Sequence, residues 1–156
     1  MPVRIDFVQG AGEKSALCAD VIKTLPDWFG ILEANENYIA GMANRDVFAA
    51  YVEGQPVGLI ALKYHFNETA EIWWMGIKPG HHRQGIGQEL FATAKGHAAA
   101  KGCRQMIVNT LSARSSDEYY ARTRVFYLKM GFRPLFEDHG ENPVNPMMWM
   151  ILPLAP

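Results

Sequence analysis

The residues from Pro79 to Phe91, PGHHRQGIGQELF, place polar side chains and two glycines ahead of an apolar-striped segment. Backbone N–H groups at the start of a helix lack intrahelical acceptors, and the helix dipole adds about half a positive charge there. Phosphate oxygens bind at such positions. Gly85 and Gly87 would let the backbone approach a pyrophosphate, while Arg83 or the neighbouring histidines could add charge-assisted hydrogen bonds. The stretch is therefore a candidate anion-binding turn.

Other interpretations of this stretch concern metals and nucleotides. His81 and His82 are adjacent in a loop and lack the helical i, i+4 spacing of a metal pair, which favours solvated loop residues. No Gly-Lys-Ser/Thr closes a Walker A loop, and Leu90 stands where a dinucleotide fingerprint needs its third glycine. A glycine turn that only starts a helix stays open as an alternative.

The segments around this stretch alternate between strand-like and helix-like patterns. Two helices are expected within residues 15–40, and one each over 85–101 and 118–130. Strands are expected at 3–8, 46–52, 57–66, 70–77, 104–111, 132–137 and 146–152, the second and third joined as a hairpin at EGQP. Strands that meander first and alternate with helices later predict a mixed α/β sheet with helices on its faces.

Composition and charge narrow the class of protein. With 156 residues, 49% hydrophobic and 20% charged, the chain has the balance of one soluble globular domain. Fifteen basic against sixteen acidic residues give a net charge of −1, so neither nucleic acid nor a membrane surface is an expected partner. Its longest apolar runs are far shorter than the ~20 residues of a membrane span. Cys18 and Cys103 lack metal-ligand spacing, and no signal peptide precedes them, so we expect a cytoplasmic protein.

A second motif, YLKMGF, begins at Tyr127 and ends at Phe132. With it, the chain resembles the GCN5-related N-acetyltransferase (GNAT) family. In that family a strand ends in an aliphatic residue and is followed by Pro, by Arg/Gln-x-x-Gly-x-Gly/Ala at a helix start, and later by Tyr-x-x-x-Gly-Phe. Here the two motifs are GIKPGHHRQGIG and YLKMGF. The resemblance runs from the hairpin near Val47 to the end and is strongest from Glu71 to Phe132.

The resemblance implies a fold and a co-substrate. The fold would be a GNAT-like mixed, mostly antiparallel central sheet of about six to seven strands. Helices would cover both faces, and two parallel central strands, AEIWWMGI and RQMIVNTL, would splay apart to admit acetyl-CoA. No metal is implied. One position departs from the pattern, because His82 replaces the usual Arg or Gln. The implied cofactor-binding residues are Met75, Gly76 and Ile77 for the pantetheine arm, His82, Arg83, Gln84, Gly85, Ile86, Gly87 and Gln88 around the pyrophosphate, and Asn109, Phe126 and Tyr127.

The family also implies catalytic roles. Tyr127 matches the residue that in many members protonates the leaving CoA thiolate, although a packing role for this tyrosine stays open. Glu71, within the same Ala-Glu-Ile start as in the histone-acetyltransferase branch, is the candidate base for the acceptor amine. Glu68, a chain of waters or a plain solvated position are its alternatives. A backbone N–H near Met75 or Gly76 could stabilise the oxyanion.

The acceptor is the part on which the sequence gives least. A small amine, a peptide N-terminus or a protein lysine all fit, and homodimerisation through PMMWMIL is an expectation. Two rivals to an enzyme of this family are a non-catalytic acyl-CoA-binding sensor and a small metalloenzyme. The candidate walls and acidic groups of an acceptor site, each with a core or solvent-facing alternative, are Trp28, Phe29, Tyr38, Tyr64 and Trp149 with Asp27, Glu33 and Glu36.

Overall fold

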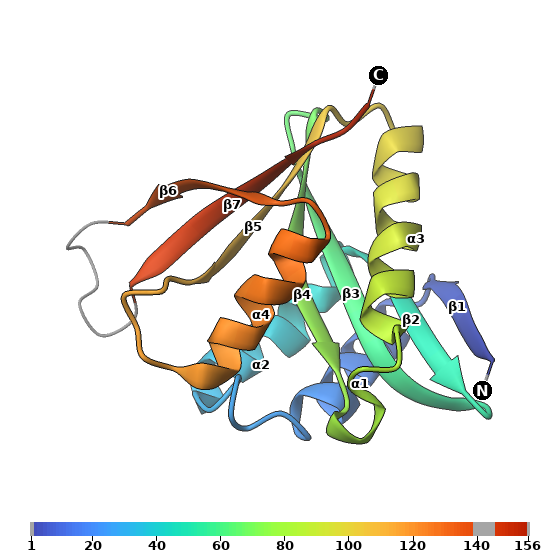
Figure 1. The fold of residues 1–156 in the computed structure, drawn as a ribbon. Helices are drawn as coiled ribbons and strands as arrows, with labels where there is room; N and C mark the ends of the chain where they lie inside the picture. The colour runs from blue at the N-terminus through green and yellow to red at the C-terminus, as the bar shows by residue number, and fades with distance from the viewer. Residues whose placement is uncertain (1, 139–145, 156) are drawn as a thin grey trace. The chain divides into compact units, whose positions relative to one another are not determined.

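A computed structural model describes residues 2–138 and 146–155 (Figure 1). Seven strands form one sheet in the order β1-β2-β3-β4-β5-β7-β6. The β4–β5 pair is parallel, whereas β1–β2, β2–β3, β5–β7 and β6–β7 are antiparallel, which confirms the predicted mixed, mostly antiparallel sheet. The elements are β1 (Val3–Val8), α1 (Ala11–Ile22), α2 (Leu32–Gly41), η1 (Met42–Asn44), β2 (Asp46–Val52), β3 (Gln55–His65), β4 (Thr69–Ile77), η2 (Pro79–His81), α3 (Ile86–Ala100), β5 (Gln105–Leu111), α4 (Glu118–Lys129), β6 (Arg133–Glu137) and β7 (Met147–Pro153).

The chain divides into two compact units. Unit 1 comprises Met1–Lys63 and Trp73–His97, and unit 2 comprises Tyr64–Ile72 and Ala98–Pro156. The strands β3 and β4 and the helix α3 therefore contribute residues to both units.

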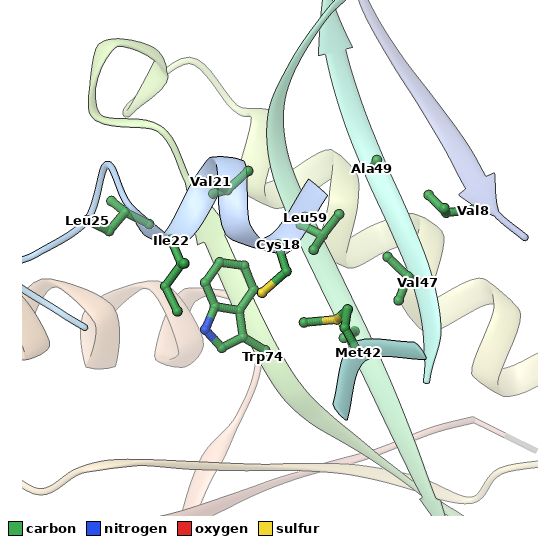
Figure 2. Close-up of a cluster of buried hydrophobic side chains, with 11 residues drawn as sticks. Val8, Cys18, Val21, Ile22, Leu25, Met42, Val47, Ala49, Leu59 and Trp74 are labelled. Atoms are coloured by element: carbon green, nitrogen blue, oxygen red, sulfur yellow. The ribbon is translucent and has the colours of Figure 1, made fainter. Parts of the chain in front are cut away.

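The core of unit 1 lies between α1 and one face of its strands. Val47 and Ala49 alternate along β2 and, like Leu59 of β3, are fully buried in this cluster. In Figure 2 the Trp74 ring lies between Ile22 and Cys18, and Val47 and Ala49 lie further away along β2. A β-strand sends alternate side chains to one face, so this pattern places every second residue of β2 in the core. The cluster contains Val8, Cys18, Val21, Ile22, Leu25, Met42, Val47, Ala49, Leu59, Ala61 and Trp74.

The opposite face of the same strands is covered by α3. The ring of Phe48 lies 5.2 Å from that of His97, and the His97 ring stacks on Phe7 at 5.4 Å. His97 Nε2 also lies 3.0 Å from an Asp46 carboxylate oxygen. Because Val47 and Phe48 are adjacent on β2, α1 and α3 cover opposite faces of the strands of unit 1. Within this unit, the expected helices on both faces are confirmed.

The β2–β3 hairpin has the turn that its sequence predicts. Glu53 and Gly54 have φ values of 52° and 78°, and Val52 pairs directly with Gln55. Two successive left-handed residues match the right-handed twist of the flanking strands, which is why a two-residue turn favours a glycine here.

Unit 2 holds the parallel start of the β4–β5 pair. The register runs from Thr69 opposite Gln105 to Ile72 opposite Val108, and Gln105 Nε2 donates to Thr69 Oγ1 at 2.7 Å. On its other side β5 pairs with β7 along its whole length.

The first helix begins earlier than its apolar pattern indicates. The spacing predicts a start near Ser15, but α1 begins at Ala11, and the Lys14 N–H already donates to the Gly10 carbonyl at 2.9 Å. The first turn, Ala11–Lys14, has no large apolar side chain, so apolar periodicity gives no signal there. Glu13 in that turn suits the positive end of the helix dipole.

Two features of the described part of the chain concern membranes and metal ions. Within residues 2–138 and 146–155, no helix is long and apolar enough to cross a bilayer. In the same ranges no group of three or more His, Cys, Asp or Glu side chains is placed to hold a metal ion.

Both cysteines are free and buried, which makes a testable prediction about their reactivity. Burial raises the pKa of the Cys18 thiol to about 12 and also raises that of Cys103. At pH 8 about one Cys18 in 10⁴ would be a thiolate, the form that attacks disulfide reagents. We expect slow labelling of the folded protein by a chromogenic disulfide and immediate labelling of both thiols in concentrated guanidinium chloride. Rapid labelling in the folded state would contradict this expectation.

Candidate active site

The loop from β4 to α3 adopts an unusual backbone conformation. Arg83 and Gly85 have φ values of 62° and 78°, both in the left-handed region. Turns that include left-handed residues direct successive N–H groups into one concavity, which is a common anion-binding arrangement. Arg83, Gln84 and Gly85 are all exposed, so the amides of this turn lie at the surface.

The first turn of α3 continues this set of amides. The Glu89 N–H donates to the Gly85 carbonyl at 3.1 Å, so the preceding amides of Ile86, Gly87 and Gln88 have no intrahelical acceptor. The Ile86 side chain is buried and so anchors the start of the helix. A Cβ added at Gly85 would meet no atom within 4 Å, so the space above this amide is open. We call the amides of Arg83–Gln88 the amide turn.

The His82 side chain connects the start of the amide turn to the end of β4 and is not a solvated loop residue. Its Nε2 lies 2.6 Å from the Ile77 carbonyl at the end of β4, and its ring meets Trp28 edge to face at 5.6 Å. The side chain is half-buried. These contacts correct the expectation of a solvated loop histidine, and they explain what a histidine contributes at this position.

Gly76 has a packing reason to be glycine. A Cβ at this position would lie 2.4 Å from Trp74 Cη2 and 2.9 Å from Leu25 Cδ1. Real Cβ atoms do not approach other atoms so closely, so the core of unit 1 excludes a side chain here. Its neighbours Met75 and Ile77 are half-buried.

An aromatic group joins the segment after α1 to α2 and β4 in unit 1. Phe29 contacts Trp74 at 5.1 Å, and Tyr38 contacts Trp73 at 5.2 Å between ring centroids. The Arg45 guanidinium lies 4.4 Å above the Trp73 ring, a cation–π contact that no sequence pattern predicted. Of the other predicted acceptor walls, Tyr64 and Trp149 belong to unit 2, where Lys101 lies over the Tyr64 ring at 4.4 Å and Trp149 pairs with Asn109.

The backbone after α4 fixes Tyr127 tightly. The Phe132 N–H donates to the Tyr127 carbonyl at 3.0 Å, and the Gly131 N–H donates to the Leu128 carbonyl at 3.1 Å. Gly131 has φ 102°, so these bonds form a Schellman motif with glycine in the left-handed position. The Phe132 ring packs on the Tyr127 ring at 5.6 Å, the hydrophobic contact that accompanies this motif. The sequence YLKMGF is thus a helix stop that immobilises its own tyrosine.

The other end of α4 is equally well defined. The Asp117 carboxylate accepts hydrogen bonds from the Tyr119 and Tyr120 amides at 2.9 and 3.0 Å, which makes it the N-cap. Arg124 Nη1 donates to the Leu111 carbonyl at 2.7 Å and ties the helix to the end of β5.

Tyr127 is buried, and its protonation state follows from that burial. Its side chain is 7% exposed, and desolvation, with a smaller contribution from Tyr120, raises the pKa of its phenol well above the ordinary value of 10. A raised pKa favours the neutral phenol, so Tyr127 carries its proton at neutral pH. Phe126, whose ring lies 5.6 Å from that of Tyr127, is half-buried beside it.

Glu71 is paired, whereas its competitor faces solvent. Glu71 Oε1 lies 2.7 Å from His65 Nε2, and the Glu71 side chain is 13% exposed. Glu68 is 58% exposed and forms a long ion pair, 3.9 Å, with Arg104. This difference in burial favours Glu71 over Glu68 as a functional carboxylate. The sequence prediction missed His65.

The sequence model of the acetyltransferase (GNAT) domain matches residues 43–134 of the chain. The chain belongs to the GNAT family. This confirms the resemblance, and it makes the protein an acetyl-CoA-dependent acetyltransferase. The matched range includes Glu71, the amide turn and Tyr127 of the GNAT domain.

Solved structures share the fold of this GNAT protein. A protein assigned to the GNAT family from Desulfovibrio desulfuricans matches with a TM-score of 0.83 and 16% identity, over 99% of this chain and 100% of the other. The ribosomal-protein-S18-alanine N-acetyltransferase of Escherichia coli matches with a TM-score of 0.76 and 14% identity, over 99% and 95%. A Bacillus subtilis acetyltransferase in complex with CoA gives 0.73 and 19%, over 99% and 100%. At these identities the likeness concerns the fold alone. A comparison with curated protein sequences found no match.

The predicted site residues of the GNAT domain are distributed over the two units. Unit 1 contains Met75, Gly76, Ile77 and the amide turn, and it brings His82 next to them. Unit 2 contains Glu71, Asn109, Phe126 and Tyr127. Asn109 is exposed and follows directly on Val108, where the β4–β5 register ends. Their individual roles in cofactor binding and catalysis stay predictions.

Proposed function

We propose that this GNAT acetyltransferase moves the acetyl group of acetyl-CoA directly onto a primary amine in a ternary complex. The observation that carries the proposal is the amide turn, where the left-handed Arg83 and Gly85 precede three free helix amides. Such a turn binds the charge of a pyrophosphate without needing a cationic side chain. Because the backbone amides do the binding in this proposal, the cofactor can still bind when His82 replaces the Arg or Gln usual in the family.

In this proposal the remaining cofactor contacts follow the family pattern. Backbone groups of Met75, Gly76 and Ile77 pair with the amides of the pantetheine arm, as an added strand would. Asn109 and Phe126 are the further cofactor-binding residues that the family pattern implies. The half-buried positions of Met75 and Ile77 are consistent with a strand edge that a ligand can reach.

The proposed chemistry requires one proton acceptor and one proton donor. Glu71 takes a proton from the acceptor ammonium, and the free amine attacks the thioester carbonyl. A backbone N–H of Met75 or Gly76 stabilises the oxyanion. The new N–C bond forms, the C–S bond breaks, and the Tyr127 phenol gives its proton to the leaving thiolate. The second proton that the nitrogen loses as the amide forms passes through solvent to the Tyr127 phenolate, and Glu71 releases its proton to solvent. Burial raises the pKa of this phenol, so Tyr127 carries the proton to be transferred at neutral pH.

The acceptor can be identified with two measurements on the intact protein. Isothermal titration with acetyl-CoA and CoA tests binding, and release of CoA thiol tests transfer to a panel of amines. The panel should contain small polyamines, a lysine peptide and a peptide with an N-terminal alanine, since a structural neighbour acts on such an alanine. We expect saturable binding and amine-dependent thiol release. The two buried cysteines would not contribute to the thiol signal.

The outcomes of this experiment separate the rivals. Absence of acetyl-CoA binding would overturn the proposal. Binding without turnover on any amine would indicate a non-catalytic acyl-CoA sensor instead.

We also propose that residues 1–156 form one acetyltransferase domain and that this domain forms homodimers. We propose further that the protein acts in the cytoplasm, in keeping with its two free thiols.

A further inference from the structure

We propose that His65 is a positioning residue for the carboxylate of Glu71. His65 would hold one carboxylate oxygen so that the other remains free to accept the proton of the acceptor amine. This inference rests on the proposed role of Glu71 as the base and adds a residue that the family motifs do not contain.

The geometry of the β3–β4 hairpin fixes the pair. His65 is the last residue of β3, and Glu71 is the third residue of β4. Between them, Phe66 and Asn67 have φ values of 53° and 57°, and the Glu68 N–H donates to the His65 carbonyl at 3.1 Å. This closed turn determines where the imidazole stands. Its Nε2 lies 2.7 Å from Glu71 Oε1, within the range of a charge-assisted hydrogen bond.

Donor and acceptor chemistry assigns the roles within this pair. An ionised carboxylate only accepts hydrogen bonds, so His65 must carry a proton on Nε2 and donate it. Oε1 is then occupied, and Oε2 is the oxygen that remains to accept a substrate proton. Without the imidazole, the carboxylate would be free to sample other rotamers, and proton transfer would lose its preset geometry.

Other charged groups of the hairpin are engaged elsewhere. Glu68 pairs with Arg104 at 3.9 Å, and Lys101 lies over the Tyr64 ring at 4.4 Å. His65 is 35% exposed, against 13% for Glu71, so the imidazole forms the solvent side of the pair. The carboxylate is therefore the inner group and the histidine its outer support.

A double-mutant cycle tests this inference with an amine that the wild type acetylates. His65→Phe removes the donor, and His65→Gln restores an amide N–H at about the position of Nε2. We expect His65→Phe to lower kcat about 10-fold with an unchanged KM for acetyl-CoA, and His65→Gln to recover most of that loss. Glu71→Gln should lose most of the turnover. In the Glu71→Gln background, His65→Phe should cost nothing further, because the carboxylate it positions is gone.

Controls distinguish this role from simple stabilisation. Thr69→Val removes the Gln105 hydrogen bond on the same strand and should leave kcat unchanged. If His65→Phe fails to fold, His65→Asn provides a second test. Its amide N–H ends about one bond short of the Nε2 position and cannot reach Glu71 Oε1, so we expect the same loss of kcat. A wild-type kcat for His65→Phe, or an equal loss in both backgrounds, overturns the inference while the proposed function stands. A wild-type kcat for Glu71→Gln refutes the base assignment as well.

Discussion

Replacing Tyr127 by phenylalanine is expected to lower kcat for acetyl transfer by about 100-fold, the usual contribution of a general acid. The substitution removes one oxygen from a side chain that is 7% exposed and keeps the ring that packs on Phe132. Binding of acetyl-CoA should therefore stay within about twofold of wild type. The initial rate of CoA thiol release at saturating substrates gives kcat, and isothermal titration gives the Kd of acetyl-CoA.

A matched control for this prediction lies on the same helix. Tyr119→Phe makes the same atomic change on α4, at a residue without a proposed catalytic role, and should retain wild-type kcat. Equal turnover for Tyr127→Phe and wild type would show that Tyr127 is a packing residue and that another group protonates the thiolate. A parallel loss of kcat and of acetyl-CoA affinity would point to a structural effect instead.

Introducing a negative charge into the amide turn is expected to weaken acetyl-CoA binding strongly. Gly85→Asp would place a carboxylate among the amides proposed to hold the pyrophosphate. Two like unit charges about 5 Å apart repel by roughly 3 kcal/mol at an effective dielectric constant of 20, and solvent at this exposed position reduces that value. We expect the Kd of acetyl-CoA to rise about 30-fold relative to Gly85→Asn at fixed ionic strength.

The comparison with Gly85→Asn separates charge from backbone strain. Asparagine and aspartate have the same shape, and both enter the left-handed region more readily than other side chains, so each can adopt φ 78°. Added salt should narrow the difference between the two variants, because screening weakens the repulsion. Identical affinities for the two variants would mean that the pyrophosphate binds elsewhere.

The features that the sequence predicts well are those encoded by local chemistry. Glycine at the left-handed position after α4 and an aromatic residue after it are sufficient to predict the helix stop at Gly131. Likewise, Gly54 between two β-branched and aromatic runs predicts the β2–β3 hairpin. In both cases the residues that form the feature are neighbours in the chain.

The features that the sequence did not predict are contacts that a side chain makes once the chain has folded. The bond from His82 to the Ile77 carbonyl joins residues five apart in a loop, and no periodic pattern marks it. The His65–Glu71 pair depends on a turn in which Phe66, a residue uncommon at positive φ, is left-handed. Similarly, the packing reason for Gly76 is the way the Trp74 ring folds back over it and the approach of Leu25, which is far away in sequence. Such contacts follow from the three-dimensional fold and not from spacing.

The Schellman closure of α4 has a consequence for how this protein can change in evolution. Asp117 fixes the start of the helix and Gly131 fixes its end, so the register of every residue between them is set from both sides. One residue added within the helix would rotate Tyr127 by about 100° relative to the start. Substitutions along α4 are therefore compatible with a fixed phenol, whereas insertions and deletions are not. The number of residues in α4 is therefore expected to be conserved for the same reason as Tyr127, because both determine the position of the phenol.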